Sequence, residues 1–287
     1  IEAIKPSHRG WLYAYLRAPT VRSMMTSAQY GHMIKHLEVG HLDSLPFVEP
    51  PVEAYEHFEK IAQQIMNCRD EALDLTNRAL GLYGGAIGEP AEIQDGTNGF
   101  TQQASAMFGG QRRLEGHFHN PVARAAEKAI RKSGRPTQLL FDLVQDVFIP
   151  GRFKHIYGPD GFPYLDSAQI LEVSPDVEKY VLSLENEKKA GYLVEAGTLL
   201  LPCSGQLHGI IGSVVLAGHW HENKVLTNHI LRIVPKARPP IRIGYLQAVL
   251  AHPTLGRPRV LRGAYGSSVP ELSVEDMKGM TIPRLAE

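Results

Sequence analysis

Two acidic residues and a lysine stand in the order that metal-dependent nucleases use. Asp176 is followed by Glu187 and by the pair Lys188 and Lys189. In such nucleases two carboxylates hold Mg²⁺ and a lysine steadies the attacking water. The intervening stretch is charged and lacks the buried strands that would aim these side chains at one point. We therefore interpret it as a solvated hairpin and keep a metal-dependent nuclease as an alternative function.

Histidines are the other residues whose spacing could support chemistry. They recur at alternating positions, as His117 with His119 and His219 with His221, and His208 and His229 are further candidates. Alternating residues share one face of a strand, but zinc needs three or four ligands that converge. The spacing does not guarantee such convergence. We therefore predict no metal site and leave contacts with phosphates or bases as the alternative.

Other catalytic motifs are missing from the sequence. It has no Gly-rich phosphate loop, no GxSxG elbow and no Asn/Asp-Pro-Pro-aromatic run of the kind that holds an extruded base. Asn120-Pro121-Val122 comes nearest to the last of these, and a helix N-cap followed by proline explains it better. We expect a non-catalytic chain that recognises a ligand and needs no cofactor.

The composition is that of an ordinary globular protein, with 43% hydrophobic and 21% charged residues. Its 287 residues suffice for about two domains. No apolar run of about 18 residues and no signal pattern occurs, so we expect neither membrane insertion nor secretion. Cys68 and Cys203 form no CxxC motif, which favours a reducing cytoplasm.

The net charge of zero predicts weak non-specific attraction to nucleic acid. Lysine and arginine nevertheless gather in three stretches, at 112–135, 152–155 and 236–262. Such uneven charge is typical of a solvated surface as well as of a binding face, so charge alone does not decide between them.

A segment near the start of the chain returns near its end. Residues 10–20 (GWLYAYLRAPT) match residues 244–254 (GYLQAVLAHPT) without a gap, and one inserted residue then aligns 28–31 with 263–266. A period of about 235 residues is far longer than the roughly 20 to 50 residues of solenoid repeats, which indicates a duplicated domain. We expect residues 1–50 to be the C-terminal part of a first copy and residues 111–287 to be a second copy.

The segment between the copies predicts a long helix, residues 51–84, with one narrow apolar stripe. Apolar residues recur at intervals of three and four, at Phe58, Ile61, Ile65, Cys68, Ala72, Leu75, Ala79 and Leu82. This is the a/d pattern of a coiled coil. Pro50-Pro51 would begin the helix and Gly84-Gly85 would end it, giving a spacer of roughly 48 Å. Packing on its own domain is the alternative, but so narrow a stripe favours a partner helix, either missing from this chain or supplied by another.

The second copy predicts an α+β domain. Residues 85–110 are rich in Gly, Gln and Ser, which is typical of a linker. Asn120 and Pro121 begin a predicted helix that ends at Ser133-Gly134, and a shorter helical stretch is expected at 137–144. Short β-prone runs follow at 162–165, 198–201, 210–216 and 230–234, before a helical segment at 244–250. We expect an irregular β core with flanking helices.

The order of these pieces resembles the specificity subunit of type I restriction-modification enzymes, in which a long helix follows each target-recognition domain. Residues 113–118 (RLEGHF) resemble the start of a recognition domain, and residues 197–205 (GTLLLPCSG) with 211–214 (IGSV) resemble its strand, Ser-Gly turn and Ile-Gly strand. Residues 244–246, 265–269 and 280–283 resemble its closing segment. The heptad helix lies where the family has its spacer, so the resemblance covers nearly the whole chain.

This resemblance implies a non-catalytic subunit that reads one half of a bipartite target per recognition domain. Its partners would be double-stranded DNA, adenine-methyltransferase subunits docked on the helices, and a motor and nuclease subunit. The family has two full recognition domains and two spacer helices packed together, whereas this chain has part of the first domain and one helix. It is either part of a longer subunit or assembles with a second copy. The alternatives are a fragment of a single-chain restriction enzyme and a coiled-coil scaffold without a DNA role.

Reading a sequence requires side chains at base edges, with others on phosphates. In the family, loops reach the groove, and by that resemblance the first candidate loop, 151–158, contributes Arg152, Lys154, His155 and Tyr157. The second candidate is the turn 204–208 with its flank, which contributes Ser204, Gln206, His208, Asn228 and His229. The closing loop contributes Tyr265, Ser267 and Ser268, and the first copy contributes Arg22, Gln29 and Tyr30.

Overall fold

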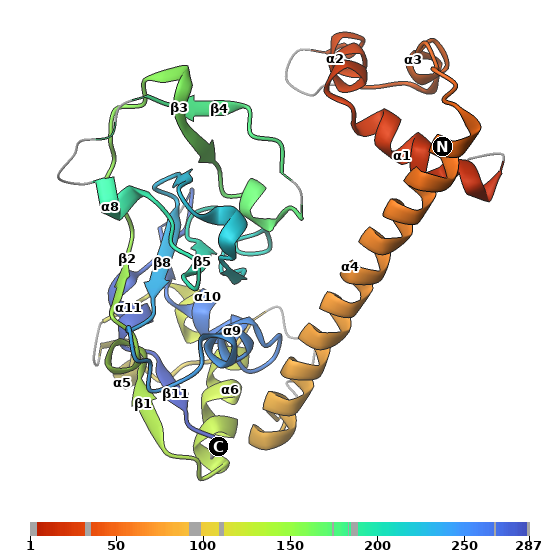
Figure 1. Cartoon of the computed structure of the whole chain (residues 1–287). Helices are drawn as coiled ribbons and strands as arrows, with labels where there is room; N and C mark the ends of the chain where they lie inside the picture. The colour runs from red at the N-terminus through yellow and green to blue at the C-terminus, as the bar shows by residue number, and fades with distance from the viewer. Residues whose placement is uncertain are drawn as a thin grey trace. The chain divides into compact units, whose positions relative to one another are not determined.

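The computed structural model describes residues 5–31, 36–91, 99–108, 112–173, 175–182, 184, 189–266 and 268–285. The chain forms two compact units, Ile1–Asn77 and Arg78–Glu287, and the long helix α4 (Val52–Ile87) contributes residues to both (Figure 1). None of the helices in the described part of the chain combines the length and the apolar character needed to cross a bilayer.

The N-terminal unit is helical. It contains η1 (Pro6–His8), α1 (Arg9–Arg17), α2 (Pro19–Ser27), α3 (Val39–Asp43) and the first part of α4. Gly10 of α1 lies against α4, so closely that a Cβ atom on it would be 2.3 Å from the carbonyl carbon of Phe58. The carboxylate of Glu59 accepts the Gly10 amide at 2.8 Å and the Arg9 guanidinium at 2.9 Å. A glycine contact and a carboxylate thus fix α1 on the start of α4.

The predicted long helix is confirmed as α4, but it continues past the glycines that were expected to end it. Gly84 lies where a Cβ atom would be 2.8 Å from Nε2 of His252, so glycine permits a close approach there rather than termination. The helix ends before Gly88, whose φ of +87° is the left-handed conformation of a C-terminal cap. Tyr83 and Ile87 are buried in the core of the C-terminal unit and anchor this end of α4.

The C-terminal unit is mixed helix and sheet, as predicted. Its main sheet is antiparallel, in the order β2 (Asp146–Phe148), β8 (Ile230–Val234), β5 (Leu199–Pro202) and β6 (Val215–Leu216). A second sheet has β3 (Tyr157–Leu165) between antiparallel β4 (Lys179–Val181) and parallel β7 (Val225–Leu226). Two small antiparallel pairs join β1 (Thr137–Leu139) to β11 (Thr281–Pro283) and β9 (Ala264–Tyr265) to β10 (Glu271–Leu272).

Helices surround these sheets. They are α5 (Ala104–Phe108), η2 (Gly116–His119), α6 (Pro121–Lys132), α7 (Leu140–Leu143), η3 (Gln169–Leu171), α8 (Lys189–Tyr192), η4 (His219–His221), α9 (Ile243–Ala251), α10 (Arg257–Arg262) and α11 (Val274–Lys278). The predicted start of α6 is confirmed, because the Asn120 side chain accepts the Val122 amide at 2.8 Å and Pro121 is the first helical residue.

The central strand β5 is buried on both faces and separates two cores. Leu199 and Leu201 point into the larger core with residues of α6 and α9, whereas Leu200 points into a second core. This is the period of two that a strand imposes. Arg232 of β8 is also buried, and its guanidinium donates to the carbonyls of Gly191, Tyr192 and Leu193 around the end of α8.

Three sequence predictions are wrong in detail. The stretch 137–144 is strand β1 followed by α7, because β1 pairs with the distant β11. Only Val215–Leu216 of the run 210–216 is a strand, because Gly212 has a φ of +72° within a turn. The histidine pairs lie on the 3-10 turns η2 and η4 rather than on strands.

Several elements of the two similar sequence segments have equivalent bounds, although α2 (Pro19–Ser27) and α10 (Arg257–Arg262) differ in length. α1 and α9 begin and end at equivalent residues, and so do α3 and α11 after the single insertion. The isolated bridge between Tyr30 and His36 corresponds to the pairing of Tyr265 with Glu271. The glycine after each of these tyrosines has a left-handed φ, 101° at Gly31 and 100° at Gly266. Equivalent sequence positions therefore have equivalent backbone roles.

Candidate nucleic-acid interface

Two of the three candidate loops of the C-terminal unit form one polar edge. The Ser204 hydroxyl lies 2.6 Å from Nδ1 of His229, and Ser204 also forms a backbone bridge with Glu271. The Gly205 amide donates to the Pro270 carbonyl at 3.1 Å, which brings the closing loop alongside. We call this surface the reading edge, and its members are Ser204, Gln206, His208, Asn228, His229, Tyr265 and Ser268. Gln206, His208, Tyr265 and Ser268 are exposed, and the other three are half-buried. Ser267 lies outside the described residues.

The hydroxyl of Ser204 fixes the orientation of His229. The same hydroxyl lies 4.0 Å from the Cys203 sulfur. Burial raises the pKa of the Cys203 thiol to about 11, so this cysteine packs in the core and is not a thiolate nucleophile.

The first candidate loop divides into outward and inward residues. Arg152 and Lys154 are exposed, and so is Tyr157 at the start of β3. His155 instead packs among aromatic rings, with ring centroids 4.4 Å from Phe153 and 5.2 Å from Tyr164, and its Nε2 atom is buried. His155 thus anchors the loop, whereas its basic neighbours face solvent.

The candidate positions of the first copy lie on α2 and in the segment that follows it. Arg22 is half-buried on α2, and Gln29 is half-buried after it. Tyr30 is 50% exposed, and its hydroxyl donates to Glu38 at 2.5 Å. Tyr30 and its counterpart Tyr265 are both exposed, so the repeat presents a tyrosine in each copy.

Most of the α4 stripe faces solvent. Phe58 packs edge-on against Trp11, with ring centroids 5.0 Å apart, and Ile65 is half-buried. The remaining members, Ile61, Cys68, Ala72, Leu75, Ala79 and Leu82, are exposed, and Leu75 and Leu82 are 56% and 68% accessible. An isolated row of exposed apolar side chains along a helix is typical of an interaction surface.

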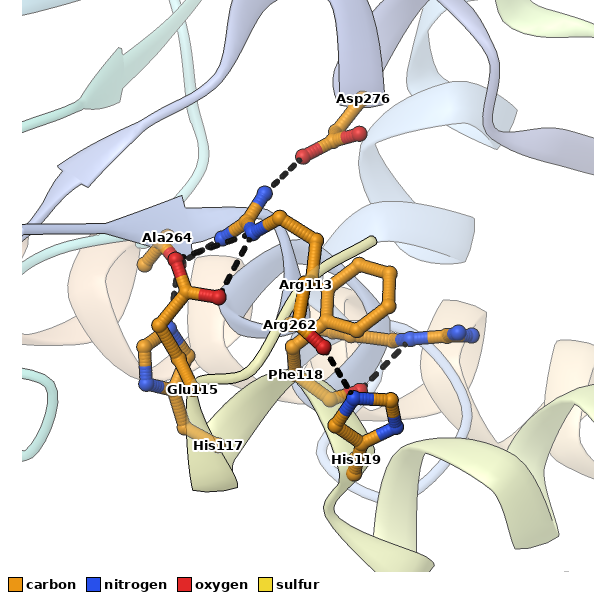
Figure 2. Close-up of polar contacts among 8 residues, drawn as sticks. All are labelled: Arg113, Glu115, His117, Phe118, His119, Arg262, Ala264 and Asp276. Carbon is orange, nitrogen blue, oxygen red and sulfur yellow. Dashed lines mark hydrogen bonds and ion pairs between the residues drawn. The ribbon is translucent and has the colours of Figure 1, made fainter. Parts of the chain in front are cut away.

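A polar network that the sequence analysis did not assign ties the start of the C-terminal unit to its closing segment (Figure 2). Arg113 donates to the Glu115 carboxylate and to Asp276, both at 3.0 Å, and to the Ala264 carbonyl at 2.8 Å. His117 contacts the same carbonyl. We call this network the clasp. It joins the segment before α6 to α10, β9 and α11.

Phe118 lies at the centre of the clasp, between two guanidinium groups. The Arg113 and Arg262 guanidinium carbons lie 4.8 and 4.5 Å from its ring centroid, a cation–π arrangement. Arg262 also donates to the Phe118 carbonyl at 2.9 Å and to Glu127 at 2.6 Å. The sequence signal for the clasp was the RLEGHF segment itself, but the roles of its arginine and histidines follow only from the fold.

The histidine candidates do not converge within the part of the chain that the structure describes. Within the described ranges, no three histidine, cysteine or acidic side chains gather as a metal would require. The His117 ring contacts the Ala264 carbonyl and His119 contacts the Arg113 carbonyl, so both serve the clasp. Of the nuclease pattern, Glu187 and Lys188 lie outside the described residues.

No protein-family model and no curated protein sequence matches the chain. Nine chains of solved structures do match, and three of them represent the result. They are the S subunit of a type I restriction-modification system from M. genitalium (14% identity, TM-score 0.35), the HsdS subunit from Thermoanaerobacter tengcongensis (12%, 0.37), and a chain of a type I R-M system solved to describe complex assembly and conformational transition (12%, 0.39). The matches cover 52%, 96% and 82% of this chain and 34%, 57% and 48% of those chains, respectively. All three come from type I systems, the family that the sequence resembles.

Proposed function

We propose that the chain is a DNA-recognising specificity subunit of a type I restriction-modification system. The observation that carries this proposal is the reading edge, where segments far apart in the sequence place serine, glutamine, histidine and tyrosine side chains on one polar surface. Such side chains hydrogen-bond to base edges and phosphates, whereas the part of the chain that the structure describes has no converging metal ligands. The subunit would be non-catalytic and would act in the cytoplasm with adenine-methyltransferase subunits.

We expect Lys154→Ala and Gln206→Ala to affect DNA binding differently. Lys154 is an exposed cation, so its loss should weaken binding to all sequences and lower the salt slope by about one. Gln206 can pair with one adenine, so its loss should relax the choice at one position, at a cost of about 1 to 3 kcal/mol. Binding-site selection and mobility shifts with a methyltransferase partner present would measure both effects.

Three outcomes would contradict the proposal. Unchanged affinity and unchanged preference in both variants would show that these loops do not read DNA. Absence of any DNA binding with the partner present would favour a coiled-coil scaffold. Cleavage of plasmid by the chain alone with Mg²⁺ would favour the nuclease alternative.

We further propose that a second helix, which is not part of the described structure, covers the α4 stripe. Its first turns would pack on Gly244, and it would run antiparallel to α4. The first copy supports this, because Gly10 is buried under the first turns of α4, while its counterpart Gly244 is exposed with nothing within 4 Å of a built Cβ. The α4 turns seated on Gly10 carry Glu59. Arg242 comes immediately before α9 and lies close to Gly244 in sequence. Its positive charge would therefore favour an acidic helix packed on Gly244.

A labelled peptide with the sequence of residues 52–87 is a suitable probe, because it has both the acidic first turns and the a/d stripe. Leu75→Asp in the full chain should reduce its binding by at least about tenfold, since a carboxylate would be buried in the apolar seam. Asn67→Asp adds the same charge on an exposed face of α4 outside the stripe and should leave binding unchanged. Fluorescence anisotropy would measure the affinity of the peptide for both variants. An equal loss of affinity in the two would show that the peptide does not bind the stripe specifically.

A further inference from the structure

A hollow of about 250 Å³ lies beside the clasp, lined by residues of α6, α10, α11 and β11. Phe118, Arg262 and Asp276, three of the side chains in Figure 2, form part of its lining. Arg259 of α10, Glu127 of α6 and Thr281 of β11 complete the polar part of the wall. None of these residues belongs to the reading edge or to the α4 stripe.

Arg259 is the buried cation of this hollow. Its side chain is 5% exposed, and its Nη2 atom donates to the carbonyl of Thr281 and, at 3.1 Å, to the hydroxyl of the same residue. Its Nε and Nη1 atoms are buried without a hydrogen-bond partner among the described residues. Arg232, the other buried arginine, has carbonyl acceptors for both of its terminal nitrogens. The Nε and Nη1 atoms of Arg259 therefore have no hydrogen-bond acceptor among the described residues.

The carboxylates around the hollow are engaged elsewhere. Glu127 is paired with Arg262 at 2.6 Å, and Asp276 is paired with Arg113 at 3.0 Å. Glu275 also lines the hollow, but its side chain is 83% exposed. The charge of Glu127 favours the protonated form of Arg259, but no carboxylate in the described part of the chain accepts from its buried Nε and Nη1 atoms, and buried donors without an acceptor are costly.

A second orphaned polar group lies near Arg259. The hydroxyl of Tyr83 is buried and has no hydrogen-bond partner in the region that the structure describes. Burial raises the pKa of Tyr83 to about 12, and the nearby charge of Arg259 opposes that rise. The hydroxyl is therefore neutral and able to donate, like the two free N–H groups of Arg259.

We propose that this hollow binds a small tetrahedral oxyanion, of the phosphate or sulfate class, through the free N–H groups of Arg259. Charge-assisted hydrogen bonds from a guanidinium to such an ion are strong, and the ion brings negative charge to a buried cation. Because Arg259 is nearly fully buried, a free ion fits the site better than the backbone of a DNA duplex, which approaches only the surface. Occupancy would stabilise the contact of α10 with β11 and thus the closing segment of the repeat.

The thermal stability of the full chain tests the site with inorganic phosphate as the probe. At ten times its dissociation constant, phosphate should raise the Tm by about 3 to 6 °C over sodium chloride of equal ionic strength. Arg259→Met should remove this rise, and in chloride alone it should be at least as stable as the wild type, because it eliminates a buried guanidinium with two unsatisfied donor atoms. Titration calorimetry should count one phosphate per chain.

Arg257→Met is the matched control on the same helix. Its guanidinium donates to the Gly209 carbonyl and the Ser213 hydroxyl rather than lining the hollow, so the phosphate effect should persist. Equal Tm values of the wild type in phosphate and chloride would overturn the proposal, and so would a full phosphate effect in Arg259→Met. If a DNA duplex reproduced the rise in phosphate-free buffer and Arg259→Met abolished it, the ligand would be a backbone phosphate and the free-ion assignment would be wrong.

Discussion

Gly10→Ala should destabilise the N-terminal unit by about 3 kcal/mol, whereas Gly244→Ala at the equivalent position should stabilise the chain by about 0.5 kcal/mol. A Cβ atom on Gly10 would lie 2.3 Å from the carbonyl carbon and oxygen of Phe58, which are backbone atoms of a long helix and cannot move aside alone. Gly244 has no atom within 4 Å of a built Cβ, so alanine there only removes the entropic cost of a helical glycine.

Hydrogen exchange of the α1 and α4 amides would report the first change, and chemical denaturation of the whole chain would report the second. Gly244→Ala should also weaken binding of the 52–87 peptide by about tenfold or more, if a helix seats on Gly244 as α4 does on Gly10. The same substitution would then stabilise the isolated chain and impair its assembly. Equal and small effects at both glycines would mean that the close contact at Gly10 is dispensable.

The elements that the sequence predicted well are those with local causes. The 3-4 spacing from Phe58 to Leu82 predicted α4, and Asn120 with Pro121 predicted the first turn of α6. The run of β-prone residues at 230–234 is strand β8 with the predicted bounds. In each case neighbouring residues carry the whole signal, through periodicity, capping or β propensity.

The elements that it missed depend on partners far away in the chain. Thr137–Leu139 is a strand because Thr281–Pro283 pairs with it, and nothing local distinguishes it from the helical turn that follows. Gly84 looked like a helix terminator. The structure instead explains the glycine by the close approach of the His252 ring, which leaves no room for a Cβ atom and comes from a segment distant in sequence. Local patterns contain no information about such contacts.

The candidate site shows the same division. Sequence reasoning grouped the turn at Ser204 with its flank at His229, and in the structure the Ser204 hydroxyl lies 2.6 Å from Nδ1 of His229. It also grouped His155 with its exposed neighbours, although alternate residues of an extended loop face opposite sides, which places His155 among aromatic rings. Which of the exposed residues contact DNA is a prediction that the variants above would test.

Arg113→Met should destabilise the C-terminal unit by about 2 to 4 kcal/mol at neutral pH, because it removes a cation that is paired with two partly buried carboxylates. Methionine preserves much of the volume, so the loss reflects the hydrogen bonds and charge pairs to Glu115, Asp276 and the Ala264 carbonyl. Chemical denaturation would measure it. Arg131→Met is the matched control, since Arg131 is exposed on α6 without an ion pair to any described residue, and its effect should be within about 0.5 kcal/mol.

The cost of Arg113→Met should also shrink in acid. Burial acts to raise the pKa of Glu115, but the hydrogen bond and charge of Arg113, together with a backbone hydrogen bond and the charge of His117, outweigh it, so the pKa is lowered in the folded wild type. A carboxyl with a lowered folded pKa stabilises the fold above its unfolded pKa, and that stability is lost as the pH falls through the folded value. The difference in unfolding free energy between wild type and variant should therefore narrow between about pH 5 and pH 3. A difference that stays constant over this range would show that Arg113 acts through packing on Phe118 rather than through its charge.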